Sequence, residues 1–425
     1  MKKVLIIGAG AMGAAFSFPL LDNNNKVTLT EPYNTKLTNQ LLKKKKFHPS
    51  LKIILPKKLL IKKFSSQLLL EKWDLVVVAV SSIGIELVKK YLNNLNKKTY
   101  LLVLTKGLKF DRKKNKIITM SEQLDPRGRK LNISVLKGPC LAKELSRKVK
   151  SYTVIANENI RIAKQIGKII SAKYYKTEYS SDVRGIEFSS AIKNIYSMVI
   201  GSGEGNNTSS ALFRKSFDEM EYLIQYFNGK KETVRGLAGL GDLYVSAVGG
   251  RNSKMGEYLG KGFSFKNAKK IGKVISTHYY KTEYSSDVKG VEFSSAIKNV
   301  DSMIIGSGQG TNTSSALFRK SIDEMKYLIK FFRGKEETVY GLAGIGDLYV
   351  SAVGGRNSKM GEYLGKGFSF KNAKKKFMRN DTIEGADLAN EIAPYVLKKI
   401  NKKKIPLMIA LLNAITKNKK LKINY

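Results

Sequence analysis

The sequence predicts an α/β N-terminal domain built on a doubly wound parallel sheet, followed by an all-α domain. Three observations predict this fold class. Apolar, strand-like runs alternate with helical segments as far as Asp182, a glycine-rich turn follows the first run, and helical patterns dominate after Asp182. A chain of 425 residues, 42% of them hydrophobic, has room for two or three domains.

The elements of the first half follow in order. A helical segment, residues 11–24, separates the first two predicted strands. The third run, "WDLVVVAVSS", is β-branched and apolar, which is typical of a strand buried on both faces. The predicted strands are residues 3–8, 26–32, 73–82, 99–108, 131–139 and 152–157.

The second half is expected to be helical. Residues 183–203 form a long apolar segment, and "IPLMIALLNAITKN" near the end predicts a further helix. Polar residues recur along one ridge of the long segment, which favours a buried helix that lines a site. The ridge residues are Glu187, Ser190, Asn194 and Ser197.

Residues 166–270 (copy one) and 271–375 (copy two) repeat one another without a gap. Eighteen positions differ, so 105 − 18 = 87 positions match. We interpret the repeat as one tandem duplication, whose removal would leave 425 − 105 = 320 residues. The predicted domains are an NAD-binding Rossmann domain at 1–182, a helical catalytic segment of copy one at 183–270, copy two at 271–375 with a helix and strand as its lead-in, and a helical tail at 376–425.

The net charge of +43 allows two interpretations. A nucleic-acid or membrane-surface partner is one. A generally lysine-rich surface is the other, and we favour it because no basic stripe is interleaved with aromatic residues. No metal-ligand spacing occurs, so we expect no metal, no nucleic acid and no membrane insertion. Three features predict a cytoplasmic protein. The chain has a single cysteine, its first apolar run is too short for a signal peptide, and no run reaches about 18 apolar residues.

"GAGAMG" follows the first strand and opens a helix, as a dinucleotide-binding turn does. Gly8 allows the tight turn, Gly10 lets a pyrophosphate approach, and Gly13 lets the helix pack on the strand. Glu31 ends the second strand, where a carboxylate binds a ribose 2′-hydroxyl and favours NAD over NADP. A turn without a ligand and a solvated acid remain the alternatives. The predicted cofactor-binding residues here are Gly8, Gly10, Ala11, Met12, Gly13 and Glu31.

Two lysines, Lys106 and Lys193, are candidate catalytic residues. Lys106, in "TKGL", ends a predicted strand at the ligand edge of the sheet, and "KGPCLAKEL" follows the next strand at that edge. Lys193 lies inside an apolar helix, where a lysine must snorkel, pair or lose its proton. A desolvated lysine with a lowered pKa can act as a base. Surface or snorkelling lysines remain the alternatives.

Asp242 lies in the glycine-rich turn of "GLAGLGDLYVSAVGGRN", and Arg251 and Asn252 follow at its end. Arginine suits bidentate recognition of phosphate, and the glycines let a ligand approach the backbone. A turn with an Asx cap is the alternative. Copy two repeats the motif with Asp347, Arg356 and Asn357.

Taken together, these motifs resemble the bacterial type of NAD(P)-dependent glycerol-3-phosphate dehydrogenase. "GAGAMG", "TKGL", "GPCLAKE", "EFSSAIKN", "GLAGLGDL", "GRN" and "TIEG" occur in the family's order. The resemblance covers nearly the whole chain once one copy is removed. It implies a Rossmann domain, a helical catalytic domain, and interconversion of sn-glycerol 3-phosphate and dihydroxyacetone phosphate with NAD, or NADP, for phospholipid synthesis.

The resemblance also implies residue roles. Lys193 or Lys298 would take the proton of the C2 hydroxyl, and Lys106 would orient that oxygen. Asp242 or Asp347 would hold substrate and lysine in register. Further residues implied for the substrate are Gly138, Cys140, Arg251, Asn252, Arg356 and Asn357, and for the cofactor Lys106, Ala142, Arg251, Arg356 and Glu384.

Three features depart from the family's pattern: Cys140 where Ser or Thr is usual, Gly250 and Gly355 where a serine is usual, and the repeat itself. Because copy two alone continues into the tail, we expect it to form the complete catalytic domain. Copy one would then be looped out, and exchange within a homodimer could cover it. The alternatives are an inactive or misassembled duplicated relic, or a related two-domain hydroxy-acid dehydrogenase.

Overall fold

A computed structural model of the chain describes residues 1–43, 46–92, 95–96, 98–113, 115–125, 131–203, 205–262 and 287–423. These residues form two compact units. The N-terminal unit comprises residues 1–192 and 221–242, and the helical unit comprises residues 193–220 and 243–425. Copy one contributes to both units, whereas copy two contributes to the helical unit. The helix and strand expected to lead into copy two, at 271–286, lie outside the described residues.

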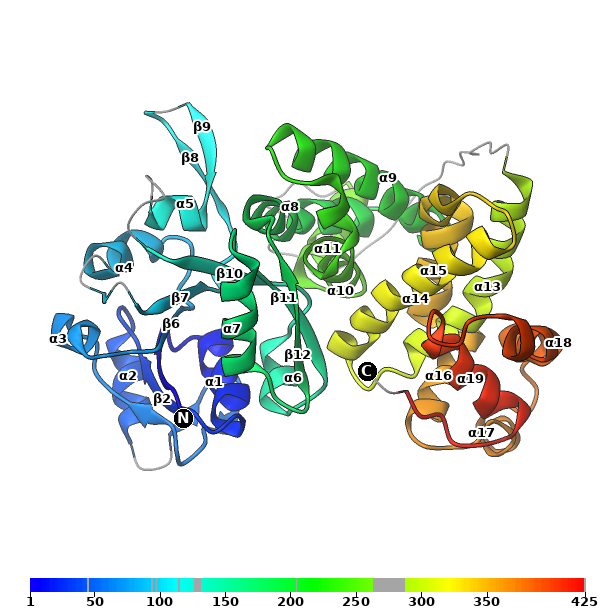
Figure 1. Cartoon of the computed structure of the whole chain (residues 1–425), viewed down its shortest axis with the longest axis horizontal. Helices are drawn as coiled ribbons and strands as arrows, with labels where there is room; N and C mark the ends of the chain where they lie inside the picture. Colours follow the sequence, from blue (N-terminus) through cyan, green and yellow to red (C-terminus); the bar gives the residue numbers. More distant parts are fainter. Residues whose placement is uncertain are drawn as a thin grey trace. The chain divides into compact units, whose positions relative to one another are not determined.

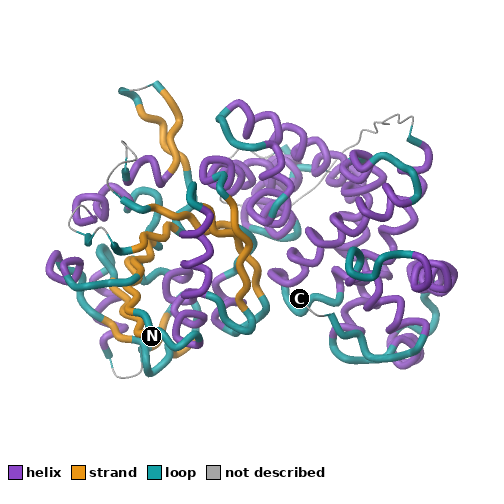
Figure 2. Tube along the Cα trace, viewed as in Figure 1, coloured by secondary structure: helices purple, strands orange, loops and turns teal. Residues whose placement is uncertain are grey.

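The N-terminal unit contains every described strand (Figure 2). Its main sheet has eight strands in the order β12-β11-β10-β7-β6-β1-β2-β5. Figure 1 shows this sheet with helices packed beside it. The strands are β1 (Lys3–Ile7), β2 (Lys26–Thr30), β5 (Leu60–Ile61), β6 (Leu75–Val78), β7 (Tyr100–Val103), β10 (Ile133–Lys137), β11 (Ser151–Ala156) and β12 (Tyr175–Ser180).

The six strands from β5 to β10 pair in parallel, so their carboxyl ends meet at one edge of the sheet. One junction departs from the predicted parallel pattern, because β11 runs antiparallel to β10. The connection between them, residues 138–150, holds only the short helix α6 (Ala142–Ser146) and turns the chain back beside β10.

Two small hairpins and seven helices complete the sequence up to β12. The hairpins are β3 (Phe47–His48) with β4 (Ile53–Ile54), and β8 (Leu108–Asp111) with β9 (Lys116–Thr119). The β8–β9 hairpin projects from the sheet in Figure 1. The remaining helices are α1 (Ala11–Asp22), α2 (Thr35–Leu42), α3 (Ser66–Leu70), α4 (Ile85–Leu92), α5 (Met120–Leu124) and α7 (Ile160–Ile170).

The sheet is buried on both faces, as its apolar runs predict. In β1, Val4 and Ile6 belong to one apolar cluster, while Leu5 and Ile7 belong to another. Side chains of a strand alternate between faces, so these two clusters are the cores on opposite sides of the sheet. The fully buried Tyr175 of β12 joins the first cluster.

After β12, the described residues form helices and turns. Copies one and two fold into the same succession of elements. Copy one forms α8 (Val183–Gly201), α9 (Gly205–Tyr226), η1 (Lys231–Arg235), η2 (Leu237–Gly241), α10 (Asp242–Ala247) and α11 (Arg251–Gly260). Copy two forms α13 (Val288–Gly306), α14 (Thr311–Phe331), η3 (Glu336–Tyr340), η4 (Leu342–Gly346), α15 (Asp347–Gly354) and α16 (Arg356–Gly365), and the chain ends with α17 (Phe370–Phe377), α18 (Glu384–Lys399) and α19 (Pro406–Thr416).

The tail packs on copy two, as expected: α18 and α19 contact α13, and α19 also contacts α14. Copy one is not looped out, which differs from the expectation. Its α9 and α10 instead pack aromatic side chains against α14 and α15 of copy two within the helical unit. Apolar surface that the tail does not cover in copy one is therefore covered by the other copy.

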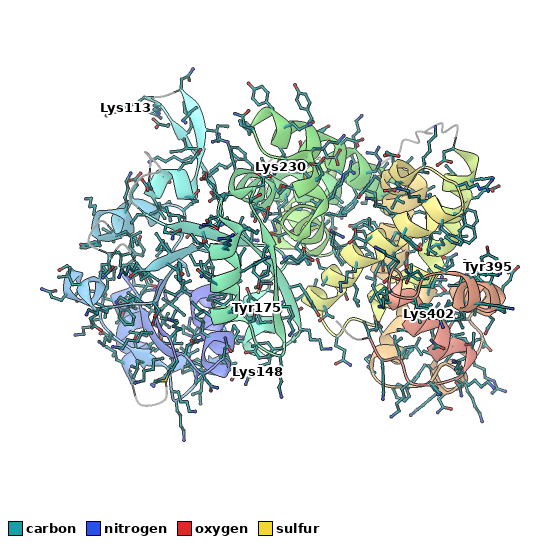
Figure 3. All side chains as sticks on the ribbon, viewed as in Figure 1. Lys113, Lys148, Tyr175, Lys230, Tyr395 and Lys402 are labelled. Atoms are coloured by element: carbon teal, nitrogen blue, oxygen red, sulfur yellow. The ribbon has the colours of Figure 1, made fainter. Side chains whose placement is uncertain are left out.

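Lysines are spread over separate elements. Lys113 lies at the end of the β8–β9 hairpin, and Lys148 and Lys402 lie on other exposed segments, while Tyr175 is enclosed (Figure 3). No helix in the described parts of the chain combines the length and apolar character needed to cross a membrane. The same residues contain no cluster of three potential metal ligands.

Candidate active site

The glycine turn between β1 and α1 has the geometry that its sequence predicts. Gly8 has a φ of +110°, and a Cβ there would lie 2.7 Å from the carbonyl carbon of Ala79. A Cβ on Gly13 would lie 1.9 Å from the carbonyl oxygen of Gly8. Gly10 is the N-cap of α1, no side chain caps it, and a Cβ there would meet nothing within 4 Å. The space beside Gly10 at the N-terminus of α1 is therefore open, which fits a dinucleotide pyrophosphate.

Two side chains fix the peptide groups of Ala9 inside this turn. A Glu31 oxygen accepts the Ala9 N–H at 2.7 Å, and its other oxygen accepts the Tyr33 N–H at 3.0 Å. The buried His48 lies 2.8 Å from the Ala9 carbonyl oxygen through Nε2. His48 Nδ1 accepts the Leu51 N–H at 3.2 Å, so Nε2 carries the proton and donates to Ala9. The sequence analysis missed His48, because only the tertiary fold brings its loop beside the turn.

At the carboxyl edge of the sheet, Lys106 forms an ion pair with Asp242. Its Nζ also lies 3.5 Å from the carbonyl oxygen of Gly138. Only 3% of the Asp242 side chain is exposed, against 35% for Lys106. Ser190 donates to the same Asp242 carboxylate at 3.2 Å. A buried carboxylate needs such partners, and this one holds a half-buried ammonium group at the ligand edge.

A second lysine stabilises this edge from below the surface. Lys137 is 1% exposed, and its Nζ donates to the carbonyl oxygens of Thr105 at 2.6 Å and Val103 at 3.3 Å. The pKa of Lys137 is lowered to about 8, mainly by burial; the nearby Lys106 ammonium acts in the same direction, and the carboxylates of Glu187 and Asp242 oppose it. Lys137 thus binds the carbonyl group next to Lys106, while the Nζ of Lys106 lies near the carbonyl group next to Lys137. The sequence analysis did not select Lys137, which ends an apolar strand.

Lys193 lies on α8 and is 6% exposed. Its Nζ donates to the hydroxyl of Ser246. Lys193 follows Ser190 by three residues on α8, and Ser246 follows Asp242 by four residues on α10, so each pair shares a helix face. Of the alternatives open at the sequence level, the structure has a buried, hydrogen-bonded lysine rather than one that snorkels to water.

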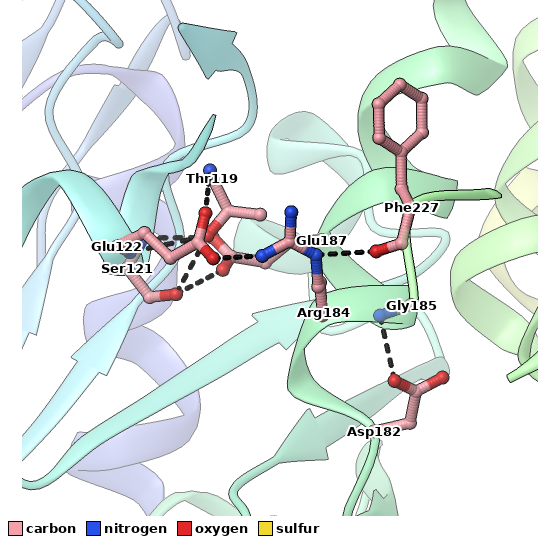
Figure 4. Close-up of polar contacts among 8 residues, drawn as sticks. All are labelled: Thr119, Ser121, Glu122, Asp182, Arg184, Gly185, Glu187 and Phe227. Carbon is pink, nitrogen blue, oxygen red and sulfur yellow. Dashed lines mark hydrogen bonds and ion pairs between the residues drawn. The ribbon is translucent and has the colours of Figure 1, made fainter. Parts of the chain in front are cut away.

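The start of α8 is fixed to α5 by charged groups (Figure 4). Arg184 pairs with Glu122, and its Nε donates to the carbonyl oxygen of Phe227 at 2.5 Å. Glu187, one of the predicted ridge residues, accepts the Ser121 N–H at 3.2 Å and the Ser121 hydroxyl. These contacts set the rotation of α8 and thereby the direction of Ser190 toward Asp242.

Copy two arranges the equivalent residues differently. Lys298 forms an ion pair directly with Asp347, whose side chain is 34% exposed. In copy one the equivalent aspartate, Asp242, pairs with Lys106 instead. The same two residue types therefore form an intra-copy pair in copy two and a pair with the sheet edge in copy one.

The tail supplies partners to copy two. Arg356 and Glu384 lie 3.1 Å apart, and both side chains are 55% exposed. Asn357 accepts the Gly385 N–H at 2.9 Å and donates to Asn299 at 3.1 Å. The structure thus brings together three residues that the sequence analysis selected: Arg356, Asn357 and Glu384.

The remaining predicted residues have varied surroundings. Asn252 donates to Asn194 at 3.0 Å. Arg251 begins α11, but its side chain lies outside the described part of the structure. Cys140 and Ala142 pack against the apolar cluster of the first sheet face. Burial raises the pKa of Cys140 to about 12, which favours the protonated thiol.

Two family models match the chain. The N-terminal model of NAD-dependent glycerol-3-phosphate dehydrogenase matches residues 3–163, and the C-terminal model matches residues 182–283 and 287–423. The chain belongs to the NAD-dependent glycerol-3-phosphate dehydrogenase family. Lys106 and Gly138 fall in the N-terminal match, and each C-terminal segment of the family contains one equivalent lysine and aspartate, so the family resemblance predicted from the motifs is confirmed.

Two known proteins and one solved structure are similar to this chain. The chain is 32% identical over 283 residues to an NADP(+)-dependent glycerol-3-phosphate dehydrogenase of Archaeoglobus fulgidus, covering 62% of this chain and 82% of that protein. It is 28% identical over 349 residues to a glycerol-3-phosphate dehydrogenase [NAD(P)+] of Bacillus velezensis, covering 79% and 99%. A crystal structure of glycerol-3-phosphate dehydrogenase from Coxiella burnetii aligns with a TM-score of 0.42 and 18% identity, covering 99% and 96%.

Proposed function

We propose that this chain is an NAD(P)-dependent sn-glycerol-3-phosphate dehydrogenase that interconverts glycerol 3-phosphate and dihydroxyacetone phosphate for glycerophospholipid synthesis. One observation carries the proposal: Asp242, almost fully buried, holds Lys106 at the carboxyl edge of the sheet that bears the glycine turn. This is the edge at which open α/β sheets bind ligands. The family membership of the chain supports the same activity.

The residues of the glycine turn would hold the cofactor. Gly8, Gly10 and Gly13 would let the pyrophosphate approach α1, and Glu31 would bind the adenosine ribose and favour NAD over NADP. Ala11 and Met12 lie in the first turn of α1 and would also contact the cofactor. When bound, the nicotinamide supplies or accepts the hydride at C2 of the substrate.

The chain's own groups would bind the substrate and move the proton. Lys106 would donate a hydrogen bond to the C2 oxygen, with Lys137 and Asp242 fixing its position. Lys193 would take the C2 hydroxyl proton on Nζ during oxidation and return it during reduction. The implied phosphate ligands are Arg251 and Asn252, with Gly138 and Cys140 beside the substrate, and Ala142 near the cofactor.

We assign these roles to copy one rather than to copy two, although the sequence analysis favoured copy two. The pair of Lys106 with Asp242 supports this choice, because it joins copy one to the sheet edge within one unit. Lys298, Asp347, Arg356, Asn357 and Glu384 would form a second set that lacks a lysine from the sheet. We further propose a cytoplasmic location, with a small phosphorylated substrate and no nucleic acid as partner.

The test is NADH oxidation by the purified full chain with dihydroxyacetone phosphate. We expect turnover that falls by about 10²-fold or more when dihydroxyacetone replaces its phosphate, because remote binding energy is lost. Replacing Lys106 with Met should lower kcat/KM by about 10²–10³-fold, and the exposed Lys143→Met should leave it unchanged. Equal activity on an unphosphorylated hydroxy acid, or none on the phosphate, would contradict the proposal.

A further inference from the structure

Aromatic side chains of copies one and two stack on each other in pairs. Phe213 of α9 stacks on Tyr349 of α15, with ring centroids 4.5 Å apart and an interplanar angle of 16°. Tyr244 of α10 stacks on Phe318 of α14 at 4.5 Å and 19°. Phe213 corresponds to Phe318 in the repeat, and Tyr244 corresponds to Tyr349. The second stack is therefore the first with the two copies exchanged.

Each of these residues also contacts its equivalent in the other copy. The ring centroids of Phe213 and Phe318 lie 6.1 Å apart, and so do those of Tyr244 and Tyr349. A residue contacts its own equivalent where a two-fold axis passes between the pair, as in the isologous interface of a homodimer. All four side chains are at most 7% exposed, so this interface is part of the core of the helical unit.

Two grooves beside the aromatic cluster repeat the same exchange. A groove of about 400 Å³ is lined by α8, α9 and α11 of copy one and is closed by Tyr349 and Val353 of copy two. Its counterpart, of about 650 Å³, is lined by α13, α14 and α16 of copy two and is closed by Tyr244 and Val248 of copy one. The pseudo-two-fold relation therefore extends beyond the four aromatic residues.

We propose that this aromatic face, formed by Phe213 and Tyr244 in copy one and by Phe318 and Tyr349 in copy two, is a self-association surface. Within one chain, the two copies bind each other through it. The single chain thus contains the contact that a chain with only one copy would make with a second copy of itself.

The differences between the copies favour this unlike pair. Phe217 of copy one stacks on Tyr340 of copy two, at 5.4 Å and 4°. The corresponding residues are Ile322 and Arg235, so both members of the stack stand at positions where the copies differ. Arg235 instead pairs with Glu221 at 2.7 Å within copy one. A pairing of two identical copies would lose this stack, which is worth about 0.5–1.5 kcal/mol in proteins.

The experiment measures the mass of full-length proteins by sedimentation equilibrium. In the first variant, Phe213→Ala and Tyr244→Ala remove the face of copy one, which releases the intact face of copy two. We expect the mass to double relative to the wild type, because two chains then meet through their second copies. In the second variant, Phe318→Ala and Tyr349→Ala are added, and we expect the wild-type mass.

A matched control is Tyr222→Ala with Tyr226→Ala, which changes exposed residues of the same helix, α9, and should leave the mass unchanged. A first variant that keeps a native circular dichroism spectrum and the wild-type mass would overturn the proposal. If the first variant unfolds, deletion of residues 166–270 provides the second measurement. That 320-residue chain should dimerise through its single copy, and Phe318→Ala should make it monomeric. A folded, monomeric deletion protein would overturn the proposal. None of these results depends on the enzymatic activity.

Discussion

Copy one and copy two place the same residues against different neighbours. Ile186, Leu237 and Ala238 of copy one are at most 3% exposed and belong to a core cluster of the N-terminal unit. Their equivalents in copy two, Val291, Leu342 and Ala343, are all partly exposed. The aspartates follow the same trend, with side-chain exposures of 3% in copy one and 34% in copy two.

The difference shows that sequence identity does not make two sites equivalent. The residue types proposed for catalysis are present twice, but the aspartate of copy one pairs with Lys106 at the sheet edge, whereas the aspartate of copy two pairs with Lys298. The Asp242 side chain is buried, and burial strengthens its electrostatic interaction with Lys106. The tail, in turn, packs on copy two through contacts of α18 and α19 with α13. Contacts to sheet and tail are therefore divided between the copies.

The largest expected effect compares Asp242→Asn with Asp347→Asn. The first change removes the charge that holds Lys106, and we expect kcat/KM to fall by about 10²–10³-fold. The second change should alter kcat/KM by about two-fold at most, because Asp347 pairs with Lys298 within copy two. Steady-state kinetics with NADH and dihydroxyacetone phosphate measure both. The opposite ranking would identify copy two as the working copy.

The second prediction concerns stability. Asp301 is fully buried, and neither of its carboxylate oxygens has a hydrogen-bond partner among the described residues. Its equivalent in copy one, Tyr196, donates a hydrogen bond to Glu219. Because an unsatisfied buried polar group costs about 1–3 kcal/mol, Asp301→Tyr should raise the free energy of unfolding by that amount. Urea denaturation measures it, with the partly exposed Asp381→Asn as control. A loss of stability would contradict this prediction.

A third prediction concerns pH. Burial and the neighbouring Glu324 raise the pKa of Asp301 well above its usual value. Burial raises the pKa of Glu324 from 4.5 to about 7, although the amides of Met408 and Leu407 and the ammonium of Lys320 oppose this shift and Asp323 adds to it. Both acids bind protons more tightly in the folded chain. The free energy of unfolding should therefore fall as the pH rises from 4.5 to about 7.

The measurement is a set of urea unfolding curves between these pH values for the wild type and Asp301→Asn. We expect the variant to gain stability over the wild type as the pH rises, by on the order of 2 kcal/mol. A difference that does not depend on pH would mean that the pKa of Asp301 is not raised in the folded chain.

Local patterns were sufficient to predict much of the molecule. The glycine turn, Glu31 at the end of β2 and the buried α8 all follow from spacing and apolar periodicity. His48 and Lys137 could not be predicted in this way, because their roles depend on loops that are distant in sequence. Such contacts are determined only when the sheet assembles.

The pairing between the copies also lay beyond the sequence. Two nearly identical copies predict that one of them takes the place of the catalytic domain, and the connection of copy two to the tail favours copy two. The aromatic stacks of Phe213 and Phe318 show a contribution that this prediction left out. Burial of the apolar surface of one copy against the other stabilises both copies. A repeat reveals which residues recur, but not that the repeated faces bind each other.

The smallest expected effect concerns the ion pair of Arg356 with Glu384. Both side chains are 55% exposed, so Glu384→Gln should change the free energy of unfolding by less than about 0.5 kcal/mol. Its effect on the KM for NADH separates the copies. If copy one is the working copy, the KM should stay within about two-fold of the wild type, because this pair joins copy two to the tail. A KM raised by about ten-fold, which corresponds to about 1.4 kcal/mol of binding energy, would place the cofactor against copy two.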